Sequence, residues 1–376
     1  MRILIAGRGF DALDRHEVGV FELDQARALR DAGHDVRFAA VDTRSIRRAR
    51  PFGCREYELH GIPVVYCAIP SGAHPASLAA AAQRRAAEMI WKRLAKEGWE
   101  PEMVHAHFGA ALLYIARRHG VPTVYTEHFS LANQDAVPSS EIAREKSTYA
   151  LADRVICVSR PLADRISRRN AIETRVVHNI VDAAFSTALD VDEKPHNGFR
   201  FVSAGSLIHR KGYDLVIRAL SIVRETTGED VALTIIGDGE EREALQSLAQ
   251  SLGLSDCIEF TGQLDRAAMV ERYRSADAFV LASRRETFGV VYIEAMAMGL
   301  PVIATVCGGP EDFVNASNGF LVPTEDADAL KDAMEKMLRE RERFDSASIA
   351  RAARESFSPE TIAAKLTAVY EEVIGC

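Results

Sequence analysis

Short runs of apolar residues alternate along this chain with longer segments in which apolar residues recur every three to four positions. The short runs are typical of buried strands, and the longer segments are typical of amphipathic helices. Strands that alternate with helices in this way indicate parallel α/β sheets. In the first half the pattern predicts strands at 2–6, 35–40, 64–67, 103–106, 123–126, 154–158 and 175–178, and helices at 20–32, 78–96 and 109–119.

The periodicity fails over residues 185–198, which are polar and contain proline and glycine, so we interpret this stretch as a linker. The pattern thus predicts an N-terminal domain at 1–184 and a C-terminal domain at 199–356, each opening as a Rossmann-like unit. Because open α/β sheets bind ligands beyond the carboxyl ends of their strands, we expect both domains to direct loops into a cleft between them. In the second domain we expect strands at 199–204, 231–236, 258–261, 278–281 and 302–305, and helices at 213–225, 242–252 and 289–298.

Composition and charge narrow the class of partner. The chain has 376 residues, of which 47% are hydrophobic and 27% charged, as in ordinary globular proteins, and its net charge of −8 argues against nucleic-acid binding. Residues 1–185 carry 26 Lys and Arg against 22 Asp and Glu, whereas the remainder carries 20 against 32. No apolar run reaches the roughly 18 residues of a membrane span, and the scattered cysteines form no CxxC pair. We therefore expect a cytoplasmic protein whose two halves face different partners.

One motif points to a dehydrogenase. Residues 7–12 follow the first strand and fit the GxGxxA fingerprint of dinucleotide binding, and Asp42 ends the second strand, where an acid could bind a ribose. That fingerprint, however, requires a helix that begins at the glycines, and here the amphipathic helix starts only after Gly19. An NAD(P)-dependent dehydrogenase therefore stays an alternative that this spacing disfavours.

The largest group of candidate functional residues follows the strand at 278–281. Glu286 lies on the loop, and Glu294 lies more than one turn into the helix that Gly289 opens. Free amides at the start of a helix bind anions, so two carboxylates beside them suit a phosphorylated sugar. The plainer interpretation is that Glu286 caps the helix and that Glu294 is merely solvated.

A second polar turn follows the strand at 199–204. Glycines at 205 and 212 bracket this turn, which also carries Arg210 and Lys211. A planar guanidinium and a compact ammonium group both suit a diphosphate. A solvated basic loop is the plainer interpretation, although it leaves the bracketing glycines unexplained.

Taken together, these features resemble the retaining, nucleotide-sugar-dependent glycosyltransferases of the GT-B fold, family 4. Glu286 and Glu294 match the EX7E motif of that family, within a run that extends to Gly309. Residues 19–36 resemble the first-helix motif of the bacterial polysaccharide-assembling branch. Further matches lie at 104–108 and 126–128 in the first domain, at 235–240 and 260–262 in the second, and at 357–370 in the closing helix.

The resemblance implies a GT-B fold: two Rossmann-like domains with parallel sheets that face each other across a cleft, with the C-terminal helix 357–376 joined to the first domain. It implies a hexosyl transfer from a UDP- or GDP-type donor to a hydroxyl of a lipid-linked or cell-surface saccharide, with retention and without a metal or a separate cofactor. A nucleotide-sugar epimerase of the same fold stays an alternative.

The roles of the family's residues carry over position by position. Glu294 would bind the ribose, Glu286 the hydroxyls of the transferred sugar, and Lys211 with Arg210 the leaving diphosphate. The implied catalytic residues are His128, Glu286, Lys211 and Arg210. The implied donor-binding residues are Gly19, Gly205, Arg210, Lys211, Gly262, Leu264, Glu286, Thr287, Phe288, Gly289, Val290 and Glu294. Because Ser206 stands where many members have Arg, either Arg210 supplies that charge or the leaving group is less stabilised.

Two further patterns resemble parts of metal sites. His105 and His107 lie two apart on a strand and so share a face, but no third ligand stands at a recognisable spacing. We therefore expect one of them to line the cleft and the other to pack. The Asp-x-Asp triplets at 190–192 and 326–328 lie in polar stretches, and we interpret both as surface.

Basic residues of the first half gather on predicted helices and loops. These clusters lie at 44–50, 84–85, 92–96 and 165–169. They indicate either a solvated face or a peripheral contact with anionic lipid on the inner face of the membrane.

Overall fold

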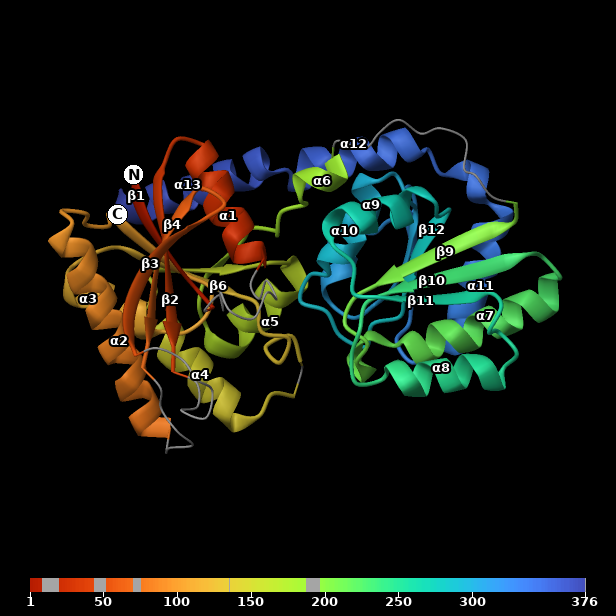
Figure 1. The fold of residues 1–376 in the computed structure, drawn as a ribbon, viewed down its shortest axis with the longest axis horizontal. Coiled ribbons are helices and arrows are strands. Elements are labelled where there is room, and N and C mark those ends of the chain that lie inside the picture. Colours follow the sequence, from red (N-terminus) through yellow and green to blue (C-terminus); the bar gives the residue numbers. More distant parts are fainter. Residues whose placement is uncertain (9–19, 44–51, 70–75, 135, 187–196, 376) are drawn as a thin grey trace. The chain divides into compact units, whose positions relative to one another are not determined.

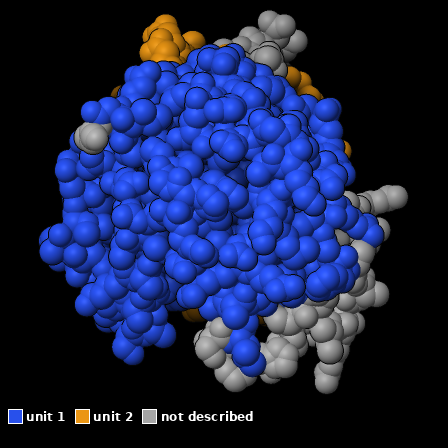
Figure 2. Space-filling view, turned by 90° about the vertical axis from the view of Figure 1, so that its left-hand side faces the viewer, with its two compact units in different colours: residues 1–180, 359–376 blue, residues 181–358 orange. Residues whose placement is uncertain are grey.

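The computed structural model describes residues 1–8, 20–43, 52–69, 76–134, 136–186 and 197–375. The chain divides into two compact units, coloured separately in Figure 2. Unit 1 comprises Met1–Ile180 and Pro359–Cys376, and unit 2 comprises Val181–Ser358. The C-terminal segment therefore belongs to unit 1, although it follows unit 2 in the sequence.

Unit 1 is built around an eight-stranded sheet with the order β3-β4-β2-β1-β5-β6-β7-β8 (Figure 1). Its strands are β1 (Arg2–Gly7), β2 (Asp35–Asp42), β3 (Gly53–Leu59), β4 (Ile62–Ala68), β5 (Met103–Ala106), β6 (Thr123–Glu127), β7 (Arg154–Cys157) and β8 (Thr174–Val176). Its helices are α1 (Val20–Asp31), α2 (Ala76–Lys96), α3 (Ala111–Arg118), α4 (Ser139–Tyr149), α5 (Arg160–Asn170) and α13 (Pro359–Ile374).

The edge strand β3 corrects the expectation of a wholly parallel sheet, because it pairs with β4 in the antiparallel direction. His60 and Gly61 connect the two strands, and both have positive φ angles, 48° and 77°. A two-residue connection with two positive φ angles is typical of a type I′ hairpin turn.

The core of unit 1 explains why the last helix returns to it. α13 lies beside α1 (Figure 1), and both pack on the same face of the sheet. Ile3 and Ile5 of β1 are fully buried there together with Leu366 and Tyr370 of α13. Since side chains alternate along a strand, Leu4 and Ala6 are buried on the opposite face.

Unit 2 is built around a six-stranded parallel sheet with the order β11-β10-β9-β12-β13-β14. Its strands are β9 (Phe199–Ala204), β10 (Val231–Ile236), β11 (Ile258–Gly262), β12 (Ala278–Leu281), β13 (Val302–Thr305) and β14 (Gly319–Val322). Its helices are α6 (Ala183–Ser186), α7 (Tyr213–Thr227), α8 (Arg242–Ser251), α9 (Arg266–Arg274), α10 (Val290–Ala297), α11 (Ala327–Arg339) and α12 (Ser346–Phe357). Short 3₁₀ turns form η1 (His209–Lys211), η2 (Gly309–Asp312) and η3 (Arg341–Arg343).

Each sheet has a switch point, where the order of strands reverses. In unit 2 it lies between β9 and β12, and in unit 1 between β1 and β5. In doubly wound proteins the loops that follow two such strands diverge, and ligands bind in the crevice between them. The loops after β9 and β12, and those after β1 and β5, are therefore the places to look for a site.

Candidate active site

The loops after β9 and β12 are joined by direct hydrogen bonds. The backbone N–H of Arg284 donates to the carbonyl of Arg210 at 2.8 Å, and the guanidinium of Arg210 donates to the carbonyl of Arg285 at 2.9 Å. Gly212 has a φ of 68°, and a Cβ there would lie 2.0 Å from the carbonyl oxygen of Ala282. The close approach of the two loops therefore requires glycine at this position.

This approach brings Lys211 and Glu286 together. Lys211 Nζ lies 2.5 Å from Glu286 Oε1, and the hydroxyl of Ser283 donates to the same oxygen at 2.9 Å. The guanidinium of Arg210 lies 3.6 Å from Glu286 Oε2. Glu286 is therefore held by two cations and a hydroxyl, and the start of α10 has no side-chain cap.

The charges of this cluster decide the state of the carboxyl group. Burial by itself raises the pKa of Glu286, but the charges of Lys211 and Arg210 and the hydrogen bonds from Lys211 and Ser283 outweigh it. The pKa of Glu286 consequently lies below its usual range, and the group is ionised at neutral pH. One anion faces two cations, so the cluster has positive charge to offer to a further anion.

Backbone groups complete the surroundings of Glu286. Its N–H donates to the carbonyl of Cys307 at 3.1 Å, and its carbonyl accepts from Gly309 at 3.0 Å. Phe288 is buried, with its ring 5.2 Å from that of Phe313. This packing fixes the loop that leads to α10, whose first amides lack partners within the helix and can bind an anion.

The remaining residues expected at the donor site are spread over three strand ends. Gly205 follows β9, and a Cβ there would lie 3.6 Å from Cε of Lys211. Gly262 ends β11, with β10 between it and β9, and Leu264 follows it. Thr287 precedes α10, Val290 begins it and Glu294 lies more than one turn into it, and all three side chains are partly buried. Gly19 lies outside the described residues.

His128 belongs to unit 1, where it follows β6. Its Nε2 lies 3.0 Å from Nδ1 of His107, and its ring lies 4.4 Å from that of Phe21. His105 is held between the hydroxyls of Tyr370 at 2.6 Å and Thr126 at 2.7 Å.

The three histidines favour the neutral form. Burial lowers the pKa of His105 to about 3, and burial together with nearby positive charge keeps the pKa values of His107 and His128 well below the usual range. His105 and His107 are both fully buried, which corrects the expectation that one of them lines a cleft. In the described part of the chain no three His, Cys, Asp or Glu side chains gather in a way that could hold a metal ion.

A second acid–cation pair lies near His128, and the sequence did not reveal it. The guanidinium of Arg8 lies over the rings of Phe21 and Phe108, 5.2 and 4.2 Å from their centroids. Its Nε is 3.5 Å from Oε1 of Glu22, which is fully buried. Burial raises the pKa of Glu22 to about 7, although the charge and hydrogen bonds of Arg8 oppose that shift.

The structure also bears on the dinucleotide fingerprint and on the Asp-x-Asp triplets. β1 ends at Gly7, and Gly9 of the dinucleotide fingerprint lies outside the described residues, so where a helix begins relative to its glycines stays a prediction. Asp326 caps α11 by accepting from the N–H of Ala329 at 2.8 Å, in agreement with a surface role for its triplet. Most of the fingerprint, the basic residues at 44–50 and the triplet at 190–192 lie outside the described residues.

Comparisons with known proteins agree with this architecture. A family model described as Glycosyltransferase Family 4 matches residues 18–185, and one described as Glycosyl transferases group 1 matches residues 187–355. Sucrose-phosphate synthase from Thermosynechococcus elongatus superposes with a TM-score of 0.79 at 22% identity, over 99% of both chains. HepE from Anabaena, solved in complex with UDP, superposes with a TM-score of 0.76 at 20% identity, over 99% of this chain and 100% of that one.

Similar curated proteins are also glycosyltransferases. D-inositol 3-phosphate glycosyltransferase 1 of Catenulispora acidiphila is 31% identical over 254 residues, which cover 60% of this chain and 61% of that protein. The lipopolysaccharide core biosynthesis glycosyltransferase LpsE of Rhizobium meliloti is 31% identical over 196 residues, covering 51% of this chain and 56% of that protein. In both comparisons the chain spans less than two thirds of the relative's length.

The class of protein is defined by two α/β units, each with a switch point, together with these matches. The chain belongs to the glycosyltransferases of the GT-B fold, with a family 4 domain followed by a group 1 domain. No helix among the described residues is both long and apolar enough to cross a membrane.

Proposed function

We propose that this chain is a retaining glycosyltransferase that moves a hexosyl group from a UDP- or GDP-type sugar donor to a hydroxyl group of an acceptor. The observation that carries this proposal is the cluster of Lys211, Arg210 and Glu286 at the switch point of unit 2. The UDP in the HepE structure and the names of the curated relatives support the same reaction class.

The residues of the cluster suit distinct parts of such a donor. Lys211 and Arg210, with the first amides of α10, bind the diphosphate, and Glu286 accepts hydrogen bonds from the sugar. Glu294 of the EX7E motif accepts from the ribose. As the bond to the leaving phosphate breaks, negative charge grows on its oxygen, and the fixed charge of Lys211 stabilises that transition state.

Retention follows if the acceptor attacks from the face that the diphosphate leaves. In that step the acceptor oxygen bonds to the anomeric carbon, the bond from that carbon to the phosphate oxygen breaks, and the acceptor proton passes to the departing phosphate. Glu286 is committed to Lys211 and Ser283, which makes it a poor covalent nucleophile. The neutral ring of His128 can exchange hydrogen bonds with a sugar hydroxyl without adding charge.

For the acceptor we propose a lipid-linked or cell-surface saccharide, with unit 1 on an anionic membrane surface. Arg84, Arg85 and Lys92 are exposed along α2 and support this contact. Arg93 and Arg169 are paired with carboxylates, so fewer cations are available than the sequence indicates. Sedimentation with anionic vesicles and release by about 0.5 M salt would support the contact. Wild-type protein that stays in the supernatant at low salt would exclude it.

A thermal-shift screen with nucleotide sugars identifies the donor, because a ligand that binds only the folded state raises the melting temperature. Product analysis then tests the reaction. A new glycosidic bond with an unchanged anomeric configuration, together with release of nucleoside diphosphate, is expected. An epimerised nucleotide sugar, or a reduced nicotinamide cofactor, would show that the proposed reaction is wrong.

A further inference from the structure

Two cysteines of unit 1 lie directly opposite each other at the edge of its sheet. Cys54 of β3 and Cys67 of β4 are register partners in the antiparallel pair, and the two thiols share a hydrogen bond. Both are free cysteines. Neither residue takes part in the proposed transfer, so the chemistry open to this pair is a separate question.

The register of the hairpin decides how closely the two side chains approach. Opposite residues of an antiparallel pair alternate between hydrogen-bonded and non-hydrogen-bonded pairs, and side chains lie closer in the latter. Because proline has no N–H to donate, Glu58 and Pro63 form a non-hydrogen-bonded pair. Steps of two residues along both strands place Cys54 and Cys67 in the same class. Their Cα atoms are then about 4.5 Å apart, which lies within the range that a disulfide spans.

The two thiols differ in accessibility and in charge environment. Cys67 is fully buried, with its Sγ 4.0 Å from Sδ of Met89 on α2, whereas Cys54 is half-buried. Arg93 of α2 pairs with Glu56, two residues from Cys54 on the same strand. The hydrogen bond from Cys67, together with the charge of Arg93, lowers the pKa of Cys54 against the effect of burial. Since the thiolate is the form that attacks oxidants, Cys54 is the thiol that reacts first.

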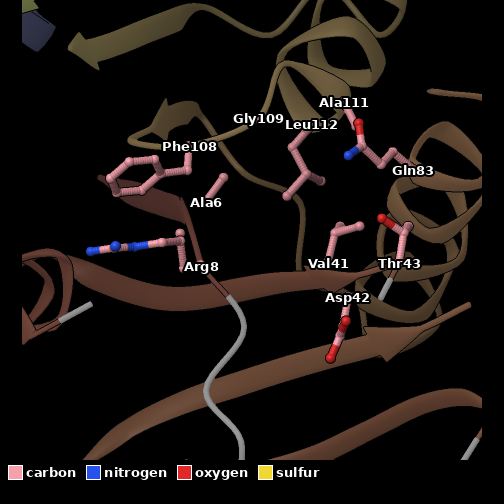
Figure 3. A pocket seen from close by; sticks show the side chains of 11 residues that line it. Ala6, Arg8, Val41, Asp42, Thr43, Gln83, Phe108, Gly109, Ala111 and Leu112 are labelled. Atoms are coloured by element: carbon pink, nitrogen blue, oxygen red, sulfur yellow. The ribbon is translucent and has the colours of Figure 1, made fainter. Parts of the chain in front are cut away.

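The pair lies one strand away from a cavity at the carboxyl end of the sheet. Val41 of β2 is the register partner of Cys67, and it lines that cavity together with Gln83 of α2 (Figure 3). α2 packs on β2, β3 and β4, and Met89 brings it onto the buried thiol. A covalent bond between the two cysteines would therefore fix the edge of the sheet on which α2 rests.

We propose that Cys54 and Cys67 form a reversible disulfide bond when the protein is exposed to a peroxide, and that this bond fixes the edge strand β3 to the sheet. The Cys54 thiolate attacks the peroxide: a sulfur–oxygen bond forms, the O–O bond breaks, and the leaving hydroxide takes up a proton. The sulfur of Cys67 then attacks that of Cys54, the sulfur–oxygen bond breaks, and the thiol proton leaves with the oxygen as water. Two thiols are oxidised to one disulfide, and one hydrogen peroxide is reduced to two waters.

The effect on β3 follows from the position of the bond. The turn at 60–61 closes one end of the hairpin, and the two cysteines lie near its open end. β3 is an edge strand, and none of its seven residues is fully buried. Strands of this kind open locally, and a cross-link near the open end removes most of the open states.

Peptide mapping of the full chain tests whether the bond forms. The reduced protein is exposed to hydrogen peroxide, the remaining thiols are blocked with iodoacetamide, and tryptic peptides are measured by mass spectrometry. Trypsin cleaves after Arg55, between the two cysteines, so the disulfide joins two peptides that otherwise separate. We expect this linked pair to be the main oxidised product and dithiothreitol to release it. Accumulation of sulfinic acid on Cys54, or a disulfide that joins other cysteines instead, would overturn the proposal.

Variants assign the oxidation to the pair. Wild-type protein should lose two hydrogen atoms in its intact mass, and Cys54→Ala and Cys67→Ala should each prevent that loss. Cys257→Ala is the matched control, because Cys257 is also half-buried and its thiol also donates a hydrogen bond, to the carbonyl of Leu254 at 3.4 Å. An unchanged loss of two hydrogen atoms in Cys54→Ala would contradict the assignment. The wild-type peptide map decides by itself if Cys67→Ala, at a fully buried position, does not fold.

Hydrogen exchange tests the effect on the edge strand. Oxidation should slow amide exchange over residues 53–59 by about tenfold or more, while peroxide should leave the same residues of Cys54→Ala unchanged. If the disulfide forms and exchange along β3 stays the same, the bond does not fix the strand. None of these measurements uses a sugar donor, so their outcome is independent of the proposed transfer.

Discussion

Each unit places a buried glutamate beside a cation at the switch point of its sheet, yet the pKa values of the two carboxyl groups are shifted in opposite directions. Glu286 of unit 2 is 5% exposed and Glu22 of unit 1 is fully buried. The pKa of Glu286 is lowered by its cationic neighbours against the effect of burial, whereas burial raises the pKa of Glu22 to about 7.

The difference comes from the partners, since both groups are desolvated. Glu286 has Lys211 at 2.5 Å, the Ser283 hydroxyl at 2.9 Å and Arg210 at 3.6 Å. Among the described residues, the cation beside Glu22 is Arg8, through its backbone N–H at 3.1 Å and its guanidinium at 3.5 Å. A shared topology therefore yields a densely charged cluster in unit 2 and, among the described residues, a single more loosely paired arginine in unit 1.

The largest effect is expected from Lys211→Ala. Loss of a fixed charge that stabilises the leaving group should lower kcat/KM by about 10²- to 10³-fold, with a fall in kcat. Steady-state kinetics measure this, with Lys331→Ala as the control, because Lys331 of α11 also pairs with carboxylates. If only KM rises while kcat holds, Lys211 binds the ground state and the transition state equally.

In unit 1, Glu22→Gln should change how stability depends on pH. Because the folded-state pKa is raised to about 7, the stability linked to the protonated group is present below the unfolded value of 4.5 and is lost as pH rises through 7. Between pH 4 and 8, the free energy of unfolding should fall in wild type by about 3 kcal/mol more than in the variant. Denaturant titrations at both pH values measure this, and parallel pH profiles would rule out Glu22 as the titrating group.

A smaller effect is expected from Ser283→Ala in unit 2. Ser283 is fully buried and positions Glu286 through one hydrogen bond. Its loss should cost about 1 kcal/mol, or roughly fivefold in donor KM, with little change in kcat. Ser348→Ala on α12 is the control, since Ser348 also bonds to a carboxylate, that of Asp345. A fall in kcat as large as that of Lys211→Ala would contradict a positioning role.

No effect is expected from removal of divalent metal. Lys211, Arg210 and the first amides of α10 supply the positive charge that a diphosphate needs, so activity should survive exhaustive treatment with EDTA. Loss of activity that manganese or magnesium specifically restores would show that the donor is held through an ion.

The strands in the middle of each sheet could be predicted from the sequence because both of their faces are buried. β5, β9, β12 and β13 have the predicted bounds, since their apolar runs stand out between polar loops. α5 escaped prediction because, of its eleven residues, only Leu162, Ala163 and Ile166 are buried. At the edge of the sheet, β3 was missed because Arg55, Glu56 and Glu58 interrupt it and leave no apolar run.

The residues of the candidate sites also differ in whether the sequence could predict their positions. Arg210, Lys211 and Glu286 stand in recognisable motifs directly after buried strands, so their strand ends could be predicted. Arg8 and Phe108 could not be paired from the sequence. They follow β1 and β5, strands about a hundred residues apart that become neighbours only through the order of the sheet.

Titration of nucleoside diphosphate into two single variants tests most directly whether the nucleotide binds at the switch point of unit 2 and not at that of unit 1. Glu294→Ala should weaken nucleotide binding by about 10- to 100-fold, the loss of charge-assisted hydrogen bonds, while Arg8→Gln should leave it unchanged. If Arg8→Gln weakens the nucleotide as strongly as Glu294→Ala, or if Glu294→Ala has no effect in a folded protein, the nucleotide is not held at the switch point of unit 2 alone.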